Sequence, residues 1–331
     1  MWKKCGRNVY ERCYNISPNL YLGDETMKTR FSEIPELNEI TRYEKITAGW
    51  SFDEKYYIEQ SNGEIFLLRL TPADKVERKQ TEREIVSLFN QLDFKMSKVV
   101  GSGLLADKSY ILYTWVEGCD LRDVIVSLDE AEQFSLGVQA GKILNAMHTI
   151  PVQDKHIPTI NKLPKKKQQL RQYEESTLRI DDDDAVIAYV KANFDLFWSQ
   201  PPTYRHGDFH TGNMLYTPEG EIGVIDFQRS VCGDRYEDFY KLQMFDVPLS
   251  IPFSVGYLKG YFNGDPDDQF WRINAAYVAH ASLYSIIWAL PFGESDVLDM
   301  KERALRNLED FDGFQEIIPK WYREYSGKWL V

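Results

Sequence analysis

The alternation of apolar and polar residues divides the chain into a strand-rich part and a mainly helical part. Between residues 41 and 116 the apolar residues come in short runs, and KYYIEQ-SNG-EIFLLRL consists of two such runs around an Asn-Gly turn, the strongest short-range signal for a hairpin. The run 109-SYILYTWVEG-118 predicts another strand. Between them, the three- and four-residue spacing of apolar residues in 81-TEREIVSLFNQL-92 predicts a helix.

Beyond residue 118 the pattern predicts helices. Ser127-Leu-Asp-Glu130 has the form of a capping box and begins a helix that we expect to reach about His148. Residues 235–310 contain three or four further helical segments. We therefore predict an α+β protein of two lobes, with a small antiparallel-sheet N-lobe at 41–116 and a larger, mainly helical C-lobe at 117–331. Residues 1–40 would form an N-terminal extension and a first helical segment.

The composition indicates a globular protein with a sizeable core, because 43% of the 331 residues are apolar. The apolar runs fall well short of the roughly 18 residues that a membrane span needs, and the N-terminus lacks the apolar core of a signal peptide. The four cysteines are scattered without a C-x-x-C pair, which favours a cytoplasmic location and argues against a thiolate metal site.

The formal net charge of the chain is -12. A negative field disfavours nucleic acid as a partner and attracts a cationic small molecule. The plainer interpretation, that the acidic residues serve solubility, stays open. We expect a small-molecule substrate, and neither a nucleic-acid nor a membrane partner.

The stretch 204-YRHGDFHTGNMLYTPEGEIGVIDFQRS-230 carries the candidate chemistry. MLYTPEGEIGVIDF predicts a hairpin that turns at 217–220. Folding its strands back places Asn213 roughly opposite Val224, with Asp226 about 7 Å further along at the same open end. Asp208 lies five residues before Asn213, in a glycine-containing loop. These oxygen ligands suit a hard cation such as Mg²⁺, and Asp208 could accept a proton from an attacking hydroxyl.

A structural interpretation of these residues is that Asp and Asn bind their own backbone, as they often do in loops. The combination of Asp208, Asn213 and Asp226 at these spacings favours a site for phosphoryl transfer instead. HGDFHTGN followed by IDF resembles the aminoglycoside phosphotransferase family, relatives of choline kinase and, more remotely, of protein kinases. The resemblance implies a protein-kinase-like fold, Asp208 as the catalytic base, Asn213 and Asp226 as Mg²⁺ ligands, and ATP as the phosphoryl donor.

The resemblance also implies supporting roles in the same region. His206 would steady the catalytic loop. In 233-GDRYEDFYKL-242, Asp238 would open a helix and support that loop. Arg229 stands where some members of the family place a basic residue near the transferred phosphate.

In the N-lobe, the two-residue period of EIFLLRL directs Leu67 and Arg69 to one face, which pairs an apolar surface for adenine with a cation for phosphate. The resemblance makes Glu84 the ion-pair partner of Arg69, at a position where the family usually has Lys. Thr47-Ala-Gly-Trp-Ser51 resembles the nucleotide-positioning loop, with the Ser51 hydroxyl facing the phosphates.

The segment Tyr113-Thr-Trp-Val-Glu-Gly118 occupies the position of the inter-lobe hinge. By resemblance, the backbone groups of Thr114 and Val116 would bind the edge of the adenine. Against a protein kinase, Gly207 stands where an arginine would precede the catalytic aspartate, and the metal motif ends in Gln rather than Gly.

These features predict an ATP- and Mg²⁺-dependent phosphotransferase that acts on a hydroxyl of a cationic small molecule, with an aminoglycoside antibiotic favoured. The alternatives are a metabolic kinase for an amino alcohol, sugar or macrolide, and a non-catalytic nucleotide-binding module, which the arginine at position 69 motivates. Three acidic segments, 263–271, 293–302 and 309–316, could bind a cationic substrate, although each is equally a solvated turn or helix face.

Overall fold

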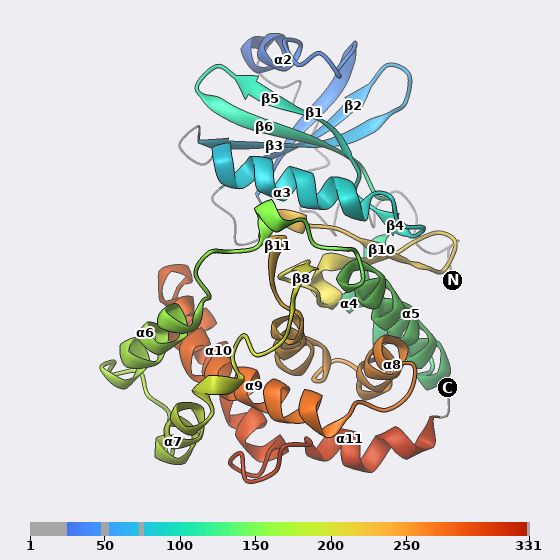
Figure 1. Ribbon diagram of the computed structural model, residues 1–331. Helices are drawn as coiled ribbons and strands as arrows, with labels where there is room; N and C mark the ends of the chain where they lie inside the picture. Colours follow the sequence, from blue (N-terminus) through green and yellow to red (C-terminus); the bar gives the residue numbers. More distant parts are fainter. Residues whose placement is uncertain (1–24, 48–52, 73–75, 330–331) are drawn as a thin grey trace. The chain divides into compact units, whose positions relative to one another are not determined.

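The computed structural model describes residues 25–47, 53–72 and 76–329, and these form two compact units (Figure 1). Unit 1 comprises the described residues up to Val124 together with Gly212–Ser230, and unit 2 comprises Ile125–Thr211 and the described residues from Val231 onward. The hairpin of the candidate stretch therefore belongs to the same unit as the N-terminal sheet. The predicted contribution of Ser51 lies outside the described residues.

Unit 1 is built on a five-stranded antiparallel sheet with the strand order β1-β2-β3-β6-β5. Its strands are β1 (Ile40–Ile46), β2 (Glu54–Gln60), β3 (Ile65–Pro72), β5 (Val99–Leu105) and β6 (Lys108–Thr114). The predicted hairpin of β2 and β3 is confirmed, since Gly63 turns the chain with a φ of +83° that favours glycine. This turn aligns Lys55 with Arg69 across the two strands.

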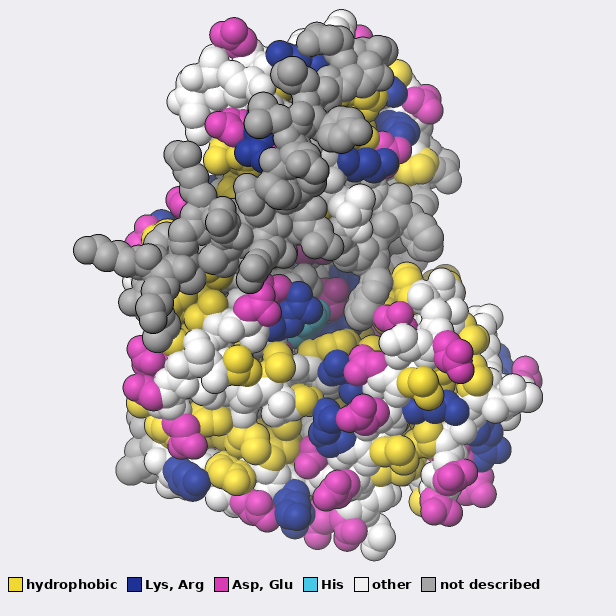
Figure 2. Space-filling model, turned by 180° about the vertical axis from the view of Figure 1, so that it is seen from behind, with side chains coloured by type: hydrophobic (Ala, Val, Ile, Leu, Met, Phe, Trp, Pro, Cys, Tyr) yellow, Lys and Arg dark blue, Asp and Glu magenta, His cyan; other side chains and the backbone are white. Residues whose placement is uncertain are grey.

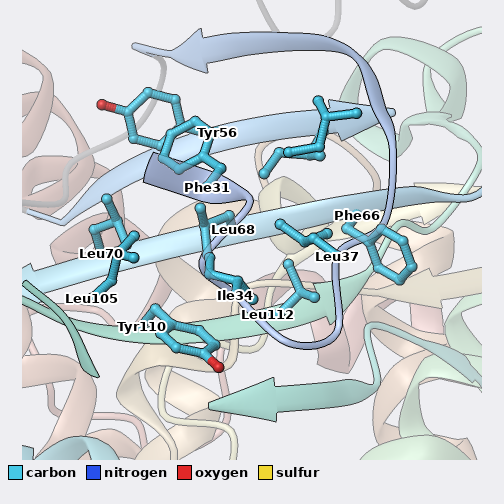
Figure 3. Close-up of a cluster of buried hydrophobic side chains, with 12 residues drawn as sticks. Phe31, Ile34, Leu37, Tyr56, Phe66, Leu68, Leu70, Leu105, Tyr110 and Leu112 are labelled. Carbon is cyan, nitrogen blue, oxygen red and sulfur yellow. The ribbon is translucent and has the colours of Figure 1, made fainter. Parts of the chain in front are cut away.

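One face of this sheet is covered by α2 (Glu25–Phe31) and the segment after it. Phe31, Ile34 and Leu37 pack there on alternate residues of the strands, as Figure 3 shows. Leu68 and Leu112 at the centre of the cluster are fully buried. Because successive strand residues face opposite sides, this packing leaves Leu67 and Arg69 on the other face.

The helix α3 (Val76–Phe89) packs beside β5 and β6. It begins five residues before the predicted start at residue 81 and ends at Phe89. Among residues 79–89 its buried side chains are Lys79, Glu82, Ile85, Val86 and Phe89, which follow the three- and four-residue spacing of one helix face. Glu84 lies off this face.

A second sheet of unit 1 has the strand order β4-β10-β9-β7. Its strands are β4 (Lys95–Met96), β7 (Cys119–Asp120), β9 (Met214–Tyr216) and β10 (Ile222–Val224), and α4 (Leu121–Ile125) follows β7. The hairpin of β9 and β10 is confirmed, but its register is one residue from our expectation: Val224 pairs with Met214, so Asn213 lies opposite Ile225 and accepts its amide hydrogen at 3.0 Å.

Unit 2 is mainly helical, as predicted, with a two-stranded sheet of β8 (Pro202–Arg205) and β11 (Val231–Asp234). Its α-helices are α5 (Glu130–His148), α6 (Leu163–Glu174), α7 (Asp184–Ala192), α8 (Ile251–Phe262), α9 (Asp268–Ala289), α10 (Glu294–Asp310) and α11 (Lys320–Tyr325). The capping box of α5 is formed by Asp129 and Glu132, two residues beyond the predicted pair.

Short helical turns complete the two units. Unit 1 contains η6 (Phe227–Arg229), and η5 (Thr211–Asn213) crosses the boundary between the units. Unit 2 contains η3 (Asp154–His156), η4 (Phe194–Leu196), η7 (Arg235–Phe239), the π-helical turn η8 (Leu242–Asp246), η9 (Leu290–Phe292) and η10 (Ser326–Lys328).

The apolar helix α9 forms the core of unit 2. Together with the turn to Phe292 it is long and apolar enough to cross a membrane, but 61% of its apolar window is buried inside the protein, which accounts for that composition. His280 on this helix is buried and contacts the Lys166 carbonyl oxygen at 3.1 Å, as expected for a structural histidine. Burial lowers the pKa of His280 to about 3.

The helices α5 and α8 cross at four glycines and lie side by side in Figure 1. A β-carbon at Gly141 would lie 2.1 Å from the Tyr257 carbonyl oxygen, and one at Gly260 would lie 2.2 Å from the Val138 carbonyl oxygen. A β-carbon at Gly137 or Gly256 would lie equally close to the backbone of the other helix. The backbones can approach this closely only because neither helix carries side chains at the crossing.

We therefore expect Gly141→Ala to lower the free energy of unfolding by about 3 kcal/mol, because overpacking against backbone cannot relax by a side-chain rotation. Urea denaturation measures the change. Gly327→Ala is the matched control, since a β-carbon there meets no atom within 4 Å. Equal stability of the two variants would contradict the close crossing.

Candidate active site

Unit 1 contains a pocket of about 170 Å³ that its two sheets line together. Six of the residues singled out from the sequence line it: Leu67, Arg69, Thr114, Val116, Asn213 and Asp226. They come from β3, from the end of β6 and from the two ends of the β9–β10 hairpin. Residues more than a hundred positions apart in the chain are therefore gathered around one space.

One part of the pocket is apolar. Ile46 and Leu67 from the five-stranded sheet and Leu215 and Ile225 from the hairpin line it. Such a space suits a flat aromatic ring, which gains from burial between aliphatic side chains.

The segment after β6 supplies hydrogen-bonding groups at the edge of this space. The Thr114 amide already donates to the Lys98 carbonyl oxygen at 2.8 Å, and the Trp115 amide donates to the Ile65 carbonyl oxygen at 3.1 Å. Among the residues that the structure describes, no group accepts the Val116 amide hydrogen. The Val116 backbone can thus offer a donor to a ligand, whereas the backbone group of Thr114 that can face a ligand is its carbonyl oxygen.

Arg69 is held at the polar end of the pocket. Its guanidinium, on a residue only 3% exposed, donates to Asp226 at 2.8 Å, to Asp53 at 3.0 Å and to Gln228 at 2.6 Å. Burial opposes the charge, but the neighbouring carboxylates, Asp226 foremost, raise the pKa of Arg69. A planar fork of donors can serve three acceptors in this way.

The predicted pairing of Arg69 with Glu84 is corrected by these contacts. In the described part of the chain, the carboxylates within ion-pair distance of Arg69 are Asp53 and Asp226. Glu84 accepts a hydrogen bond from Gln80, one turn earlier on α3, at 3.2 Å. Glu82 rather than Glu84 lies on the buried face of α3, where it binds Lys79 at 2.8 Å and the Tyr113 hydroxyl at 3.1 Å.

Sequence reasoning missed Asp53 and Lys79 beside Arg69, and the charged residues Lys55, Asp120 and Arg122 that line the pocket. Asp53 binds both Arg69 and Lys79 at 3.0 Å; burial alone would raise its pKa, but the two cations outweigh burial and lower it. Lys55 lines the pocket directly. The signal for Lys55 was present, because counting outward from the Asn-Gly turn pairs it with Arg69.

Asn213 and Asp226 meet at one end of the β9–β10 hairpin, as the predicted cation ligands should. Asp226 adopts a left-handed backbone conformation with a φ of +61°, which is uncommon for a residue other than glycine and accompanies function or strain. Its two oxygens accept from Arg69 and, at 3.3 Å, from Gln228. Each carboxylate oxygen has a second lone pair, so the carboxylate can also bind a cation.

The donor set fits Mg²⁺, which binds oxygen and commonly takes one or two protein ligands and completes its shell with water and phosphate. No group of three or more His, Cys, Asp or Glu residues suited to a metal occurs in the described ranges. A site made of Asn213 and Asp226 would therefore depend on a phosphate-bearing ligand.

The loop that carries Asp208 belongs to unit 2. Gly207 precedes it with a φ of +79°, a conformation that the arginine found in protein kinases would adopt only with strain. The Asp208 carboxylate pairs with Lys241 at 2.8 Å, and its amide donates to His206 Nδ1 at 3.2 Å. His210 stacks on Phe245 with its Nε2 3.6 Å from Asp208 Oδ1.

Asp238 lies beneath this loop and is 1% exposed. It accepts the Gly207 amide at 3.2 Å and lies 3.4 Å from His148 Nε2, so it contacts the loop as a supporting residue would. The short helix η7 begins instead at Asp234, whose side chain accepts the Tyr236 amide. Burial would raise the pKa of Asp238, but Arg205 and His148 outweigh it and lower the pKa.

A second buried carboxylate, Asp246, holds the other end of the loop. It accepts from the Thr211 amide at 2.8 Å and from the Thr211 hydroxyl at 2.7 Å. Burial raises the pKa of Asp246 to about 7, although both hydrogen bonds and Arg303 oppose the shift. Two carboxylates thus position the chain on either side of Asp208.

Carboxylates of the three acidic segments have local partners. Asp265 binds Lys259 and the Tyr322 hydroxyl, Asp299 binds Arg303, and Asp310 accepts from Gln243. On the face shown in Figure 2, acidic and basic side chains are interspersed over unit 2. These segments therefore have structural contacts of their own.

Arg229 ends η6 and is half-buried.

A small antiparallel sheet with a ligand pocket, a mainly helical second unit and the H-x-D-x-x-x-x-N loop followed by Asp define the protein-kinase-like class of phosphotransferases. The profile of the phosphotransferase enzyme family APH matches residues 42–272 of this chain. The chain belongs to this family and is a small-molecule phosphotransferase. No curated protein matches the chain in sequence.

Solved structures share the fold. Aminoglycoside 2′-phosphotransferase-IIIa in its GDP complex matches with a TM-score of 0.64 and 16% identity, over 86% of this chain and 97% of that chain. A thermostable mutant of aminoglycoside phosphotransferase APH(4)-Ia with ADP and hygromycin B matches at 0.63 and 14%, over 86% and 97%. Macrolide 2′-phosphotransferase MphH from Brachybacterium faecium matches at 0.61 and 18%, over 86% and 98%. The predicted α+β fold is confirmed.

The raised pKa of Asp246 should make the stability of the protein depend on pH. Because its pKa is raised in the folded state, the folded protein binds the proton more tightly than the unfolded chain, and stability falls as pH rises from about 4 to about 7. Over this pH range the free energy of unfolding falls by on the order of 4 kcal/mol. Asp246→Asn keeps an acceptor for Thr211 and should remove this part of the pH dependence. Urea denaturation at several pH values measures it, with the exposed Asp181→Asn as control. An unchanged slope in Asp246→Asn would contradict the assignment.

Proposed function

We propose that this protein transfers the terminal phosphoryl group of ATP to a hydroxyl of a small cationic molecule, with an aminoglycoside as the foremost candidate. The observation that carries the proposal is the pocket of unit 1, in which an apolar space, a backbone edge, a cation and two oxygen ligands adjoin one another. The apolar space and the backbone edge would bind the base of a nucleoside triphosphate, the cation would bind its phosphates, and the two oxygen ligands would bind its Mg²⁺. Relatives of the same fold have been solved with ADP or GDP.

The nucleotide base would lie between Leu67 and Ile46 on one side and Leu215 and Ile225 on the other. The Val116 amide would donate to the base, and the Thr114 carbonyl oxygen would accept from it. This orientation directs the phosphates toward Arg69, which follows Leu67 on β3, and toward Asp226, which binds Arg69.

Asn213 and Asp226 would hold Mg²⁺, which when bound neutralises the phosphate charge and orients the phosphoryl group. The Asp208 carboxylate would accept the proton of the attacking hydroxyl as that oxygen bonds to the γ-phosphorus and the bond from that phosphorus to the bridging oxygen of ADP breaks. Lys241 would keep the Asp208 carboxylate oriented. Positioning and charge stabilisation then supply most of the rate.

A cationic acceptor agrees with the net charge of -12. Among relatives of the same fold, one has been solved with gentamicin and another is a macrolide phosphotransferase. A neutral or weakly basic acceptor, such as a macrolide, amino alcohol or sugar, is the alternative acceptor class.

The test is a panel of aminoglycosides, macrolides, amino alcohols and sugars, with ADP formation and the mass of the phosphorylated product as readouts. We expect one class to give a product that carries one phosphate. On that substrate Asp208→Asn should lower kcat by about a hundredfold or more, because the loss of a general base costs this much.

The exposed Asp107→Asn serves as the control for a lost carboxylate and should keep wild-type activity. Wild-type turnover by Asp208→Asn would disprove the assigned base. Nucleotide binding without ADP formation on any acceptor would support a non-catalytic module instead.

A further inference from the structure

The segment 233–242 carries a basic side chain to which the sequence assigned no role, Lys241. Its Nζ lies 2.8 Å from Asp208 Oδ1, and its side chain is only 9% exposed. His210 Nε2 lies further from the same oxygen, at 3.6 Å. All three residues belong to unit 2. The predicted base is therefore in direct contact with a buried cation.

Two aromatic rings also hold this ammonium in place. Nζ of Lys241 lies 5.1 Å from the centre of the Tyr240 ring and 5.2 Å from the centre of the Phe245 ring. A cation over the face of a ring is attracted by its π-electrons, and the attraction is stronger where water is excluded. The rings keep the same charge throughout a reaction, so this support for Lys241 does not depend on the charge of Asp208.

The negative charge of Asp208 does not last through the proposed reaction. As the acceptor oxygen bonds to the γ-phosphorus, its proton moves to the Asp208 carboxylate, and the bond from that phosphorus to the bridging oxygen breaks with its electron pair on ADP. The carboxylate becomes neutral, and its unit of negative charge passes to the phosphate groups. Lys241 then loses the charge of Asp208 while it stays buried, and a buried charge needs compensation.

The oxygens of the transferred group can supply that compensation. A hydroxyl that gives its proton to Asp208 lies about 2.6–3.2 Å from the carboxylate, and Lys241 Nζ lies at a similar distance from it. Two contacts on one carboxylate place the ammonium beside the bond that forms between oxygen and phosphorus. Lysine carries a compact charge on a flexible stem, so it can pass from Asp208 to a phosphoryl oxygen by a small rotation.

We propose that Lys241 is a catalytic residue that binds an oxygen of the phosphoryl group as this group passes to the acceptor. The inference rests on the proposed function, because it takes Asp208 as the base of phosphoryl transfer. Beyond orienting Asp208, Lys241 makes a contact that strengthens as charge develops on the phosphoryl oxygens. Contacts of this kind raise kcat rather than affinity.

The test is steady-state kinetics of the full chain with Mg²⁺-ATP and four acceptors that represent the panel: gentamicin, erythromycin, choline and glucose. On the compound that is phosphorylated fastest, Lys241→Met should lower kcat about a hundredfold and leave both KM values unchanged, because the lost contact forms only during transfer. Lys241→Gln, which keeps a hydrogen-bond donor for Asp208 but no charge, should lose as much. Lys241→Arg, which keeps the charge, should recover part of the rate.

A double variant separates a contact with the phosphoryl group from an effect on Asp208 alone. In the Asp208→Asn background, Lys241→Met should lower the residual kcat again, because the contact with the phosphoryl oxygens is still lost. A residue that only orients Asp208 would have no further effect in that background. An unchanged residual kcat would therefore overturn the proposal.

Lys259→Met is the matched control for the loss of a buried lysine. The Lys259 side chain is 7% exposed, and its Nζ lies 2.9 Å from Asp265. This variant should keep the wild-type kcat. A loss as large as that of Lys241→Met would overturn the assignment, since the removal of a buried lysine elsewhere in unit 2 would then slow the reaction equally.

Titration with ATP shows whether each variant is folded. If Lys241→Met does not fold, the comparison of Lys241→Gln with Lys241→Arg decides the proposal, because these two differ in charge. Equal kcat values in this pair would overturn it.

The wild type separates this proposal from the proposed function. If the wild type phosphorylates no compound of the panel, the proposed function is disproved and the assignment of Lys241 falls with it. If the wild type phosphorylates one compound and Lys241→Met does so at the wild-type kcat, only the assignment of Lys241 fails.

Discussion

The candidate site depends on one buried charge, the guanidinium of Arg69. A charge in a protein interior is tolerated only when neighbouring groups compensate it. Arg69 obtains that compensation from Asp53 before β2 and from Asp226 and Gln228 after β10. One side chain therefore ties the five-stranded sheet to the hairpin that carries the predicted metal ligands. A lysine, with one nitrogen, could not reach these three acceptors with the same geometry.

Much of the fold and of the site could be predicted, because both rest on short-range patterns. The β2–β3 turn at Asn62-Gly63 and the spacing of Asn213 and Asp226 are local in sequence. The errors arose where the outcome depended on a loop or on packing. Gly220, at a φ of +80°, extends the predicted four-residue turn so that Thr217 bonds to Glu221, and this moves the register by one residue. The predicted pairing of Glu84 with Arg69 was wrong, because packing determines which face of α3 is buried, and that face carries Glu82 rather than Glu84.

Unit 2 supports the Asp208 loop through buried polar groups; the family resemblance indicated Asp238 as one of them, whereas no sequence pattern indicated Asp246. Asp238 and Asp246 bind the loop at Gly207 and Thr211, and Arg205 pairs with Glu237 beside them. Asp238 and Asp246 accept backbone amides on the two sides of Asp208, and these hydrogen bonds hold the glycine-containing loop in one conformation.

The most direct test of the account is a crystal structure of the protein with Mg²⁺ and a non-hydrolysable ATP analogue. The account predicts the base between Leu67 and Ile225, with the Val116 amide as its donor and a metal ion on Asn213 and Asp226. An analogue bound outside this pocket, or a metal ion held by other residues, would contradict it.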